Sequence, residues 1–86
     1  MNKKFVFNKK TICQDKYRDM VDRMVELRKK RGLTQRELAQ KMRVTHCCVG
    51  RVETYERRLD IMETIRWLRV LKLSDDEIIE FLTQVL

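Results

Sequence analysis

Residues 34–53, TQRELAQKMRVTHCCVGRVE, contain two short amphipathic patterns with a tight joint between them. Thr34 and Glu37 have the spacing of a capping box, which satisfies the free backbone N–H groups that open a helix. The apolar face of that helix is supplied by Leu38, Ala39 and Met42. The pattern therefore predicts a short helix that begins directly after Thr34.

A second short helix is predicted after the two-residue joint of Arg43 and Val44. Thr45 is suited to cap it, and Val49 and Val52 are spaced to form a buried face. Two helices with such a joint let one brace against the DNA backbone while the next enters the major groove. The exposed first turn of the second helix then consists of His46, Cys47 and Cys48 after the cap.

The sequence before this stretch predicts one longer helix. Thr11 and Gln14 have capping-box spacing, and Gly32 is suited to end a helix in the left-handed conformation. A helix from about residue 12 to residue 31 is expected between them. Its apolar stripe consists of Tyr17, Met20, Val21, Met24 and Leu27.

The sequence after it predicts two more helices, opened by capping boxes at residues 60–63 and 74–77. The first of them is expected to bury Ile61, Ile65, Leu68 and Leu71. Core or semi-core packing is expected for Trp67 and for Met20, Met24 and Met62, with exposure of Trp67 at a subunit contact as the alternative. The prediction is an all-α, compact five-helix domain over residues 11–86, preceded by a short basic N-terminal arm, residues 1–10.

The net charge of +7 is unevenly distributed along the chain. Residues 28–58 carry ten Lys and Arg against three Asp and Glu, whereas residues 59–86 carry three against six. A basic middle third with an acidic third behind it fits a nucleic-acid-binding face on one side of a small domain. Charge alone leaves open the alternative of a solvated basic surface.

The composition argues against several other classes of protein. Three cysteines (Cys13, Cys47 and Cys48) do not form a disulfide framework, so reduced thiols in a cytoplasm are expected. No apolar run approaches the roughly 18 residues of a membrane span, and no secretory signal is seen. Neighbouring helical residues point about 100° apart, so His46, Cys47 and Cys48 do not converge on a metal ion. Neither an enzyme nor a cofactor is expected, because no catalytic constellation is present.

The segments LTQRELAQKMRVT, residues 33–45, and VGRVE, residues 49–53, together resemble the helix-turn-helix of the Cro and phage-repressor family. This is the xenobiotic-response-element class of regulators. The likeness covers roughly residues 20–80, an ordinary length for one domain. It implies a lambda-repressor-like fold and a homodimer that binds a partly palindromic operator in double-stranded DNA.

The resemblance also implies roles at matched positions. Gln35 is expected to touch a phosphate and to steady His46, while Arg57 and Arg58 meet phosphates from the loop after the second short helix. Base and nearby backbone contacts are implied for His46, Cys47, Gly50 and Arg51. The residues expected at the DNA interface are Gln35, Arg36, Thr45, His46, Cys47, Cys48, Gly50, Arg51, Arg57 and Arg58.

Arg28 and Glu53 match positions that often form a structural ion pair in this family. The chain departs from the family pattern with Arg43 in place of Gly, His46 and Cys47 in place of Gln or Ser, and Thr54 and Tyr55 in place of Asn-Gly. A positive φ at Arg43 costs on the order of 1 kcal/mol unless a phosphate contact offsets it.

The last predicted helix, about residues 75–86, carries more apolar side chains than one docked face needs: Ile78, Ile79, Phe81, Leu82, Val85 and Leu86. The surplus predicts a dimer surface, with additional core as the alternative. The resulting hypothesis is a bacterial or phage transcriptional regulator that represses by occupying its operator. Two alternatives stay open. One is an antitoxin that binds a toxin through the acidic, apolar C-terminal third and autoregulates its operon; the other is a protein-interaction module without nucleic acid.

Overall fold

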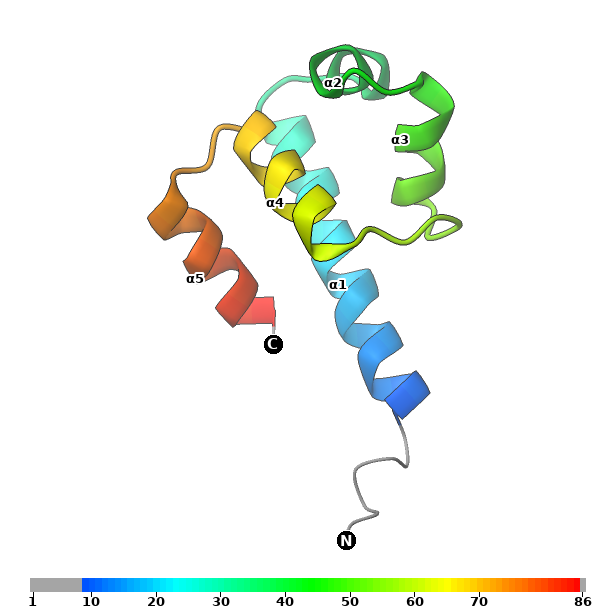
Figure 1. The fold of residues 1–86 in the computed structure, drawn as a ribbon, viewed down its shortest axis with the longest axis vertical. Coiled ribbons are helices and arrows are strands. Elements are labelled where there is room, and N and C mark those ends of the chain that lie inside the picture. The colour runs from blue at the N-terminus through cyan, green and yellow to red at the C-terminus, as the bar shows by residue number, and fades with distance from the viewer. Residues whose placement is uncertain (1–8, 86) are drawn as a thin grey trace, which may run out of the picture.

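The computed structural model describes residues 9–85, and this range contains five helices and no strand. They are α1 (Lys9–Lys30), α2 (Gln35–Met42), α3 (His46–Glu53), α4 (Ile61–Val70) and α5 (Asp75–Val85). α2 lies across one end of the long α1, α3 follows on one side of α1, and α5 lies on the other (Figure 1). The predicted all-α, five-helix architecture is confirmed.

α1 begins earlier than the sequence predicted. Lys9 and Lys10, which the prediction assigned to the basic arm, are helical, and residues 1–8 lie outside the described residues. Thr11 is therefore inside the first turn, and the capping box predicted at Thr11 and Gln14 is wrong. Lysine is a good helix former, so nothing in the two preceding residues delays the start of the helix. At the other end, Gly32 takes a φ of 73°, the left-handed conformation predicted to end the helix.

The remaining three capping boxes are confirmed. At the start of α2, the Thr34 N–H donates to Glu37 Oε1 at 2.9 Å and the Glu37 N–H donates to Thr34 Oγ1 at 3.0 Å. Equivalent reciprocal bonds join Asp60 to Glu63 and Ser74 to Glu77. Hydrogen bonds to a carboxylate favour its ionised form, so the caps hold the pKa values of Glu37 and Glu77 below the usual 4.5. The pKa of Glu63 is lowered first by the hydrogen bond from Arg57 and then by its cap.

The core is assembled from apolar faces of all five helices and the residues that join them. Its buried members are Met24, Leu38, Ala39, Met42, Val49, Val52, Trp67, Leu68, Leu71 and Ile78. Trp67 is only 3% exposed, which confirms its prediction as a core residue. Burial of Ile61 and Met62 was predicted wrongly, because they are 60% and 73% exposed. Ile61 is the first residue of α4, and helical side chains lean toward the N-terminus, so it projects past the end of the packed region.

A buried ion pair joins α1 to α3. Arg28 Nε donates to Glu53 Oε2 at 2.7 Å and Arg28 Nη2 donates to Glu53 Oε1 at 3.0 Å. The two side chains are only 9% and 8% exposed. Arg28 Nη1 also donates to the Leu33 carbonyl at 2.7 Å, and Gln35 Nε2 donates to Glu53 Oε1 at 2.8 Å. The pair therefore holds α1, the start of α2 and the end of α3 in one arrangement.

Removal of one partner of this pair is expected to destabilise the fold. Glu53→Ala should lower the free energy of unfolding by about 3–5 kcal/mol, because Arg28 stays buried without its counter-charge. Denaturant unfolding followed by circular dichroism measures the change. Glu26→Ala, at an exposed carboxylate of α1, is the control and should change stability by less than about 0.5 kcal/mol. Equal stability of the Glu53 variant and the parent would show that the pair does not hold the fold.

The capping glutamates predict a loss of stability in acid. Because their pKa values are lowered in the folded chain, their contribution is complete above the usual value of 4.5 and is lost as the pH falls through the folded-state values. Replacing Glu37, Glu63 and Glu77 by Gln keeps a capping side chain that cannot ionise. We expect the triple variant to be less stable than the parent at pH 7, with a shallower fall in denaturation midpoint below about pH 5. An unchanged pH dependence would contradict this assignment.

Candidate nucleic-acid interface

The joint between α2 and α3 depends on one residue in the left-handed conformation. Arg43 has φ 59° and ψ 44°, and its N–H donates to the Gln40 carbonyl at 3.2 Å. The next N–H, of Val44, donates to the Ala39 carbonyl at 3.0 Å. This conformation costs a non-glycine residue about 1–2 kcal/mol. The Arg43 side chain is exposed, so the joint carries a positive charge that a glycine at this position would lack.

α3 buries one face and exposes the opposite one. Val49 and Val52 are 0% and 2% exposed and pack into the core. Thr45 caps the helix, its Oγ1 accepting the Cys48 N–H at 3.2 Å. Of the other predicted contact residues on this helix, Cys48 and Gly50 are half-buried, and the exposed ones are His46, Cys47 and Arg51. The polar residues on the exposed face are those predicted to meet base edges.

The start of α2 lies beside the ion pair. Gln35 is half-buried and donates to Glu53, while its Oε1 would lie 3.8 Å from a Cβ built at Gly50. Gln35, which was expected to contact a phosphate and His46, therefore contacts α3 by its hydrogen bond to Glu53. Arg36, the next residue, is exposed.

The loop after α3, residues 54–60, is anchored to α1. Tyr55 occupies the left-handed region at φ 67°, where the family pattern has glycine. Its hydroxyl donates to the Asp22 carboxylate on α1, and this hydrogen bond raises the pKa of Tyr55. The hydrogen bond to Asp22, which a glycine could not form, holds Tyr55 in the left-handed conformation.

The two arginines of this loop have different surroundings. Arg57 is half-buried and its Nη2 donates to Glu63 Oε2 at 2.6 Å. Its Nη1 is buried without a hydrogen-bond partner among the described residues. Arg58 is exposed, and its guanidinium carbon lies 4.2 Å from the centre of the Tyr17 ring. Arg58 is open to a ligand, whereas Arg57 would have to leave Glu63 to bind one.

Tyr17, predicted only as a member of the apolar stripe of α1, also contacts the loop after α3. Its hydroxyl accepts the Leu59 N–H at 3.0 Å and lies 3.5 Å from the Arg57 carbonyl, to which it donates. Its ring is covered by Arg58. The sequence could have indicated this role, because a tyrosine in an apolar stripe needs a hydrogen-bond partner for its hydroxyl.

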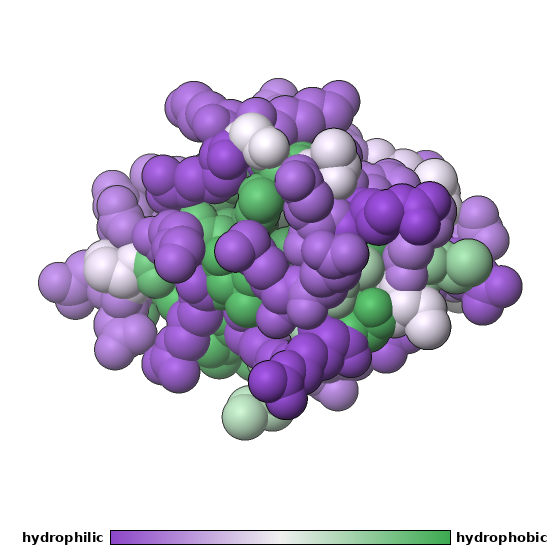
Figure 2. Space-filling view, turned by 90° about the horizontal axis from the view of Figure 1, so that it is seen from above, coloured by the Kyte–Doolittle hydropathy of each residue, from purple (hydrophilic) through white to green (hydrophobic). Residues whose placement is uncertain are grey.

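The arginines fall into two groups. Those with a hydrogen bond or ion pair to another part of the chain are Arg23, Arg28, Arg31, Arg57, Arg66 and Arg69. Those without either, among the residues whose side chains are described, are Arg18, Arg36, Arg43, Arg51 and Arg58. Four of these five belong to α2, the joint, α3 and the following loop. Figure 2, seen from the α2 end, shows mostly hydrophilic side chains with hydrophobic ones between them.

Within the described residues, no three His, Cys, Asp or Glu side chains gather into a group that could hold a metal ion. Cys47 and Cys48 are free thiols, the first exposed and the second half-buried. None of the five helices is long and apolar enough to span a membrane.

Comparison with known proteins identifies the family. A family model described as Helix-turn-helix matches residues 24–78, which run from within α1 to the start of α5. No curated protein and no solved structure matches the chain. The matched span covers well over half of the sequence and includes α2, the joint and α3. The chain belongs to the DNA-binding helix-turn-helix family of Cro and the phage repressors.

Proposed function

We propose that this protein is a sequence-specific regulator that binds double-stranded DNA as a homodimer and represses transcription by occupying a partly palindromic operator. The observation that carries the proposal is the two-sided character of α3. Val49 and Val52 dock it on the core, and His46, Cys47 and Arg51 face solvent. An α-helix fits the major groove, where each base pair has a distinct pattern of donors, acceptors and methyl groups.

Two kinds of contact are assigned to different residues. His46, Cys47 and Arg51 are proposed to read base edges, with Thr45, Cys48 and Gly50 close to the same groove. Phosphates carry no sequence information but fix the position of the protein. Phosphate contacts are assigned to Arg36, Arg43 and Arg58, whose guanidinium groups have no polar partner among the described residues, and to the N-terminus of α2 at Gln35.

The two kinds of contact should fail differently. Selection of bound duplexes from random DNA supplies the operator, and variants are then titrated against it and its single-base changes at two salt concentrations. Arg58→Ala should weaken binding to all duplexes and lower the magnitude of the salt slope by about 0.9 for each bound chain. His46→Ala should relax preference at one or two positions by about 1–3 kcal/mol with the slope nearly unchanged.

Two results would contradict this division. If His46→Ala lowers affinity uniformly with every base preference intact, the reading turn lies elsewhere, first at Arg51. If binding by the parent protein does not depend on salt, the chain does not act through phosphate contacts. A protein-interaction module would then fit better, and co-purification with an unrelated small protein would favour an antitoxin.

Arg43 is proposed to offset its backbone strain through a phosphate contact. Arg43→Gly should raise the free energy of unfolding by up to about 1 kcal/mol, because glycine adopts positive φ without steric cost, and should weaken DNA binding. Lys72 is the matched control, since it has φ 74° and lies between α4 and α5. Lys72→Gly should stabilise by a similar amount and leave DNA binding unchanged. Equal effects of both substitutions on binding would contradict the phosphate contact at Arg43.

The dimer is proposed to form through α5. Within the chain, α5 buries Ile78 and Val85, so part of the predicted surplus serves the core. Phe81 and Leu82 are half-buried, and Ile79 is 61% exposed. The exposed remainder is the proposed contact, which would set two recognition helices about one DNA turn, roughly 34 Å, apart.

Sedimentation tests this contact with one substitution on each candidate surface. Ile79→Glu should shift a dimer toward monomer, because it places a charge at the proposed apolar contact. Met62→Glu, at an exposed apolar position on α4, is the control and should leave the dimer intact. A parent that is monomeric at micromolar concentration, or a dimer broken only by the Met62 substitution, would contradict the assignment to α5.

A further inference from the structure

Two arginines lie over tyrosine rings where α1 meets the loop of residues 54–60. The guanidinium carbon of Arg58 is 4.2 Å from the centre of the Tyr17 ring, and that of Arg18 is 4.8 Å from the centre of the Tyr55 ring. One arginine comes from the loop and lies on a tyrosine of α1, while the other comes from α1 and lies on a tyrosine of the loop. The crossed arrangement places two cations on adjoining parts of the surface.

Both tyrosines are fixed at their hydroxyl ends. Tyr17 bonds the backbone of Arg57 and Leu59, and Tyr55 bonds the Asp22 carboxylate. A guanidinium that stacks on an aromatic face keeps its N–H donors free at its edge. The rings therefore hold the cations in position without using their hydrogen bonds.

Arg18 differs from the other arginines of α1 in having no polar partner among the described residues. Arg23 pairs with Asp19 at 3.0 Å, and Arg28 pairs with Glu53. Two carboxylates, Asp15 and Asp22, lie one helical turn from Arg18, and neither forms an ion pair with it; Asp22 accepts the Tyr55 hydroxyl instead. Arg18 thus belongs with the unpaired arginines of α2, the joint, α3 and the loop.

We propose that Arg18 binds a phosphate of the DNA backbone beside the one met by Arg58, so that α1 extends the interface beyond the helix-turn-helix. The inference rests on the proposed DNA-binding function and adds a contact outside the family-matched residues 24–78. Tyr55 is a positioning residue for this contact, since it holds Arg18 over the loop. The ligand chemistry is a phosphodiester, because an exposed fork of N–H donors matches phosphate oxygens.

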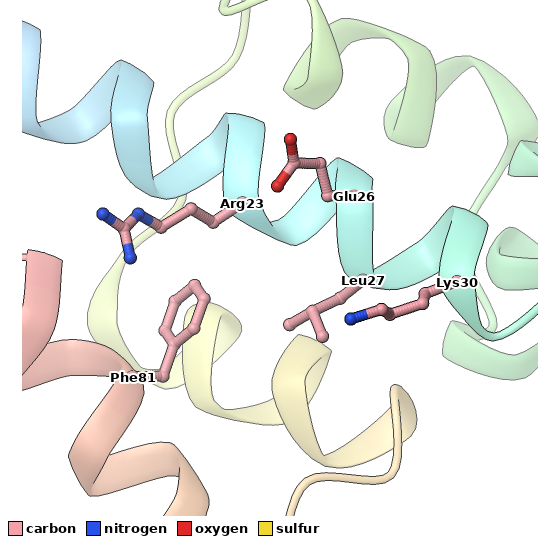
Figure 3. A pocket seen from close by; sticks show the side chains of 5 residues that line it. All are labelled: Arg23, Glu26, Leu27, Lys30 and Phe81. Atoms are coloured by element: carbon pink, nitrogen blue, oxygen red, sulfur yellow. The ribbon is translucent and has the colours of Figure 1, made fainter.

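A matched substitution on the same helix provides the control. Arg23 is five residues from Arg18, about 140° around the helix. It lines a pocket of about 340 Å³ between α1 and α5, together with Glu26, Leu27, Lys30 and Phe81. Figure 3 shows the Arg23 side chain on the α5 side of α1, near the Phe81 ring. Arg18→Gln and Arg23→Gln remove the same charge from different faces.

Full-length parent, Arg18→Gln and Arg23→Gln are titrated against the selected operator over a series of salt concentrations, and the contacted phosphates are mapped by ethylation interference. Arg18→Gln should lower the magnitude of the salt slope by about 0.9 for each bound chain and remove one phosphate from each interference pattern. Base preferences should stay as in the parent, because phosphate contacts carry no sequence information. Arg23→Gln should keep the parent's interference pattern and slope.

The outcomes separate this inference from the function on which it rests. Parent protein without salt-dependent duplex binding overturns both. If the parent binds but Arg18→Gln keeps the parent's salt slope and interference pattern, the inference alone is overturned. An equal loss of salt slope in Arg18→Gln and Arg23→Gln also overturns it, because such a loss would reflect net charge only. Thermal melting of both variants tests whether unfolding is the cause. Arg18→Lys keeps the charge but not the planar fork, so it should restore most of the salt slope but only part of the affinity.

Discussion

The Arg28–Glu53 ion pair is the contact on which the placement of α3 depends. A buried pair of charges adds little net stability over apolar packing, because desolvation offsets most of the attraction. Its effect is geometric, since two parallel hydrogen bonds from one guanidinium to one carboxylate restrict the angle between α1 and α3. Leu33 and Gln35 use further hydrogen-bonding groups of the same pair. The helix proposed to read DNA is thus fixed at its last residue by the core side of the molecule.

α3 is also bounded on both sides by non-glycine residues with positive φ, Arg43 before it and Tyr55 after it. Glycine would remove the strain at either position but would also remove a side chain. At Tyr55 the side chain ties the loop to Asp22 and supports Arg18. At Arg43 it adds a cation to the exposed joint. Strain is therefore retained on both sides of one short helix, at positions where the side chain either ties the loop to α1 or adds a surface cation.

Much of the fold could be predicted from local spacing, because the two partners of a capping box, such as Thr34 and Glu37, lie three residues apart. The exposure of Ile61 could not, since periodicity tells which residues share a face but not where the neighbouring helices end. In the candidate site, the family resemblance singled out Arg57 but not its pairing with Glu63. The hydroxyl contacts of Tyr17 join residues 40 and 42 positions apart, so they depend on the tertiary approach of α1 and the loop.

The part of α1 before the family-matched span is therefore more than an extension of a helix. In Figure 1 its N-terminal end runs on past the loop of residues 54–60. Tyr17 and Asp22 fix that loop from positions before residue 24, where the family model begins to match. The buried ion pair sets the angle of α3, and these two residues set the path of the chain that leaves it. The residues that fold as a helix-turn-helix and the residues that position its loop are consequently not the same set.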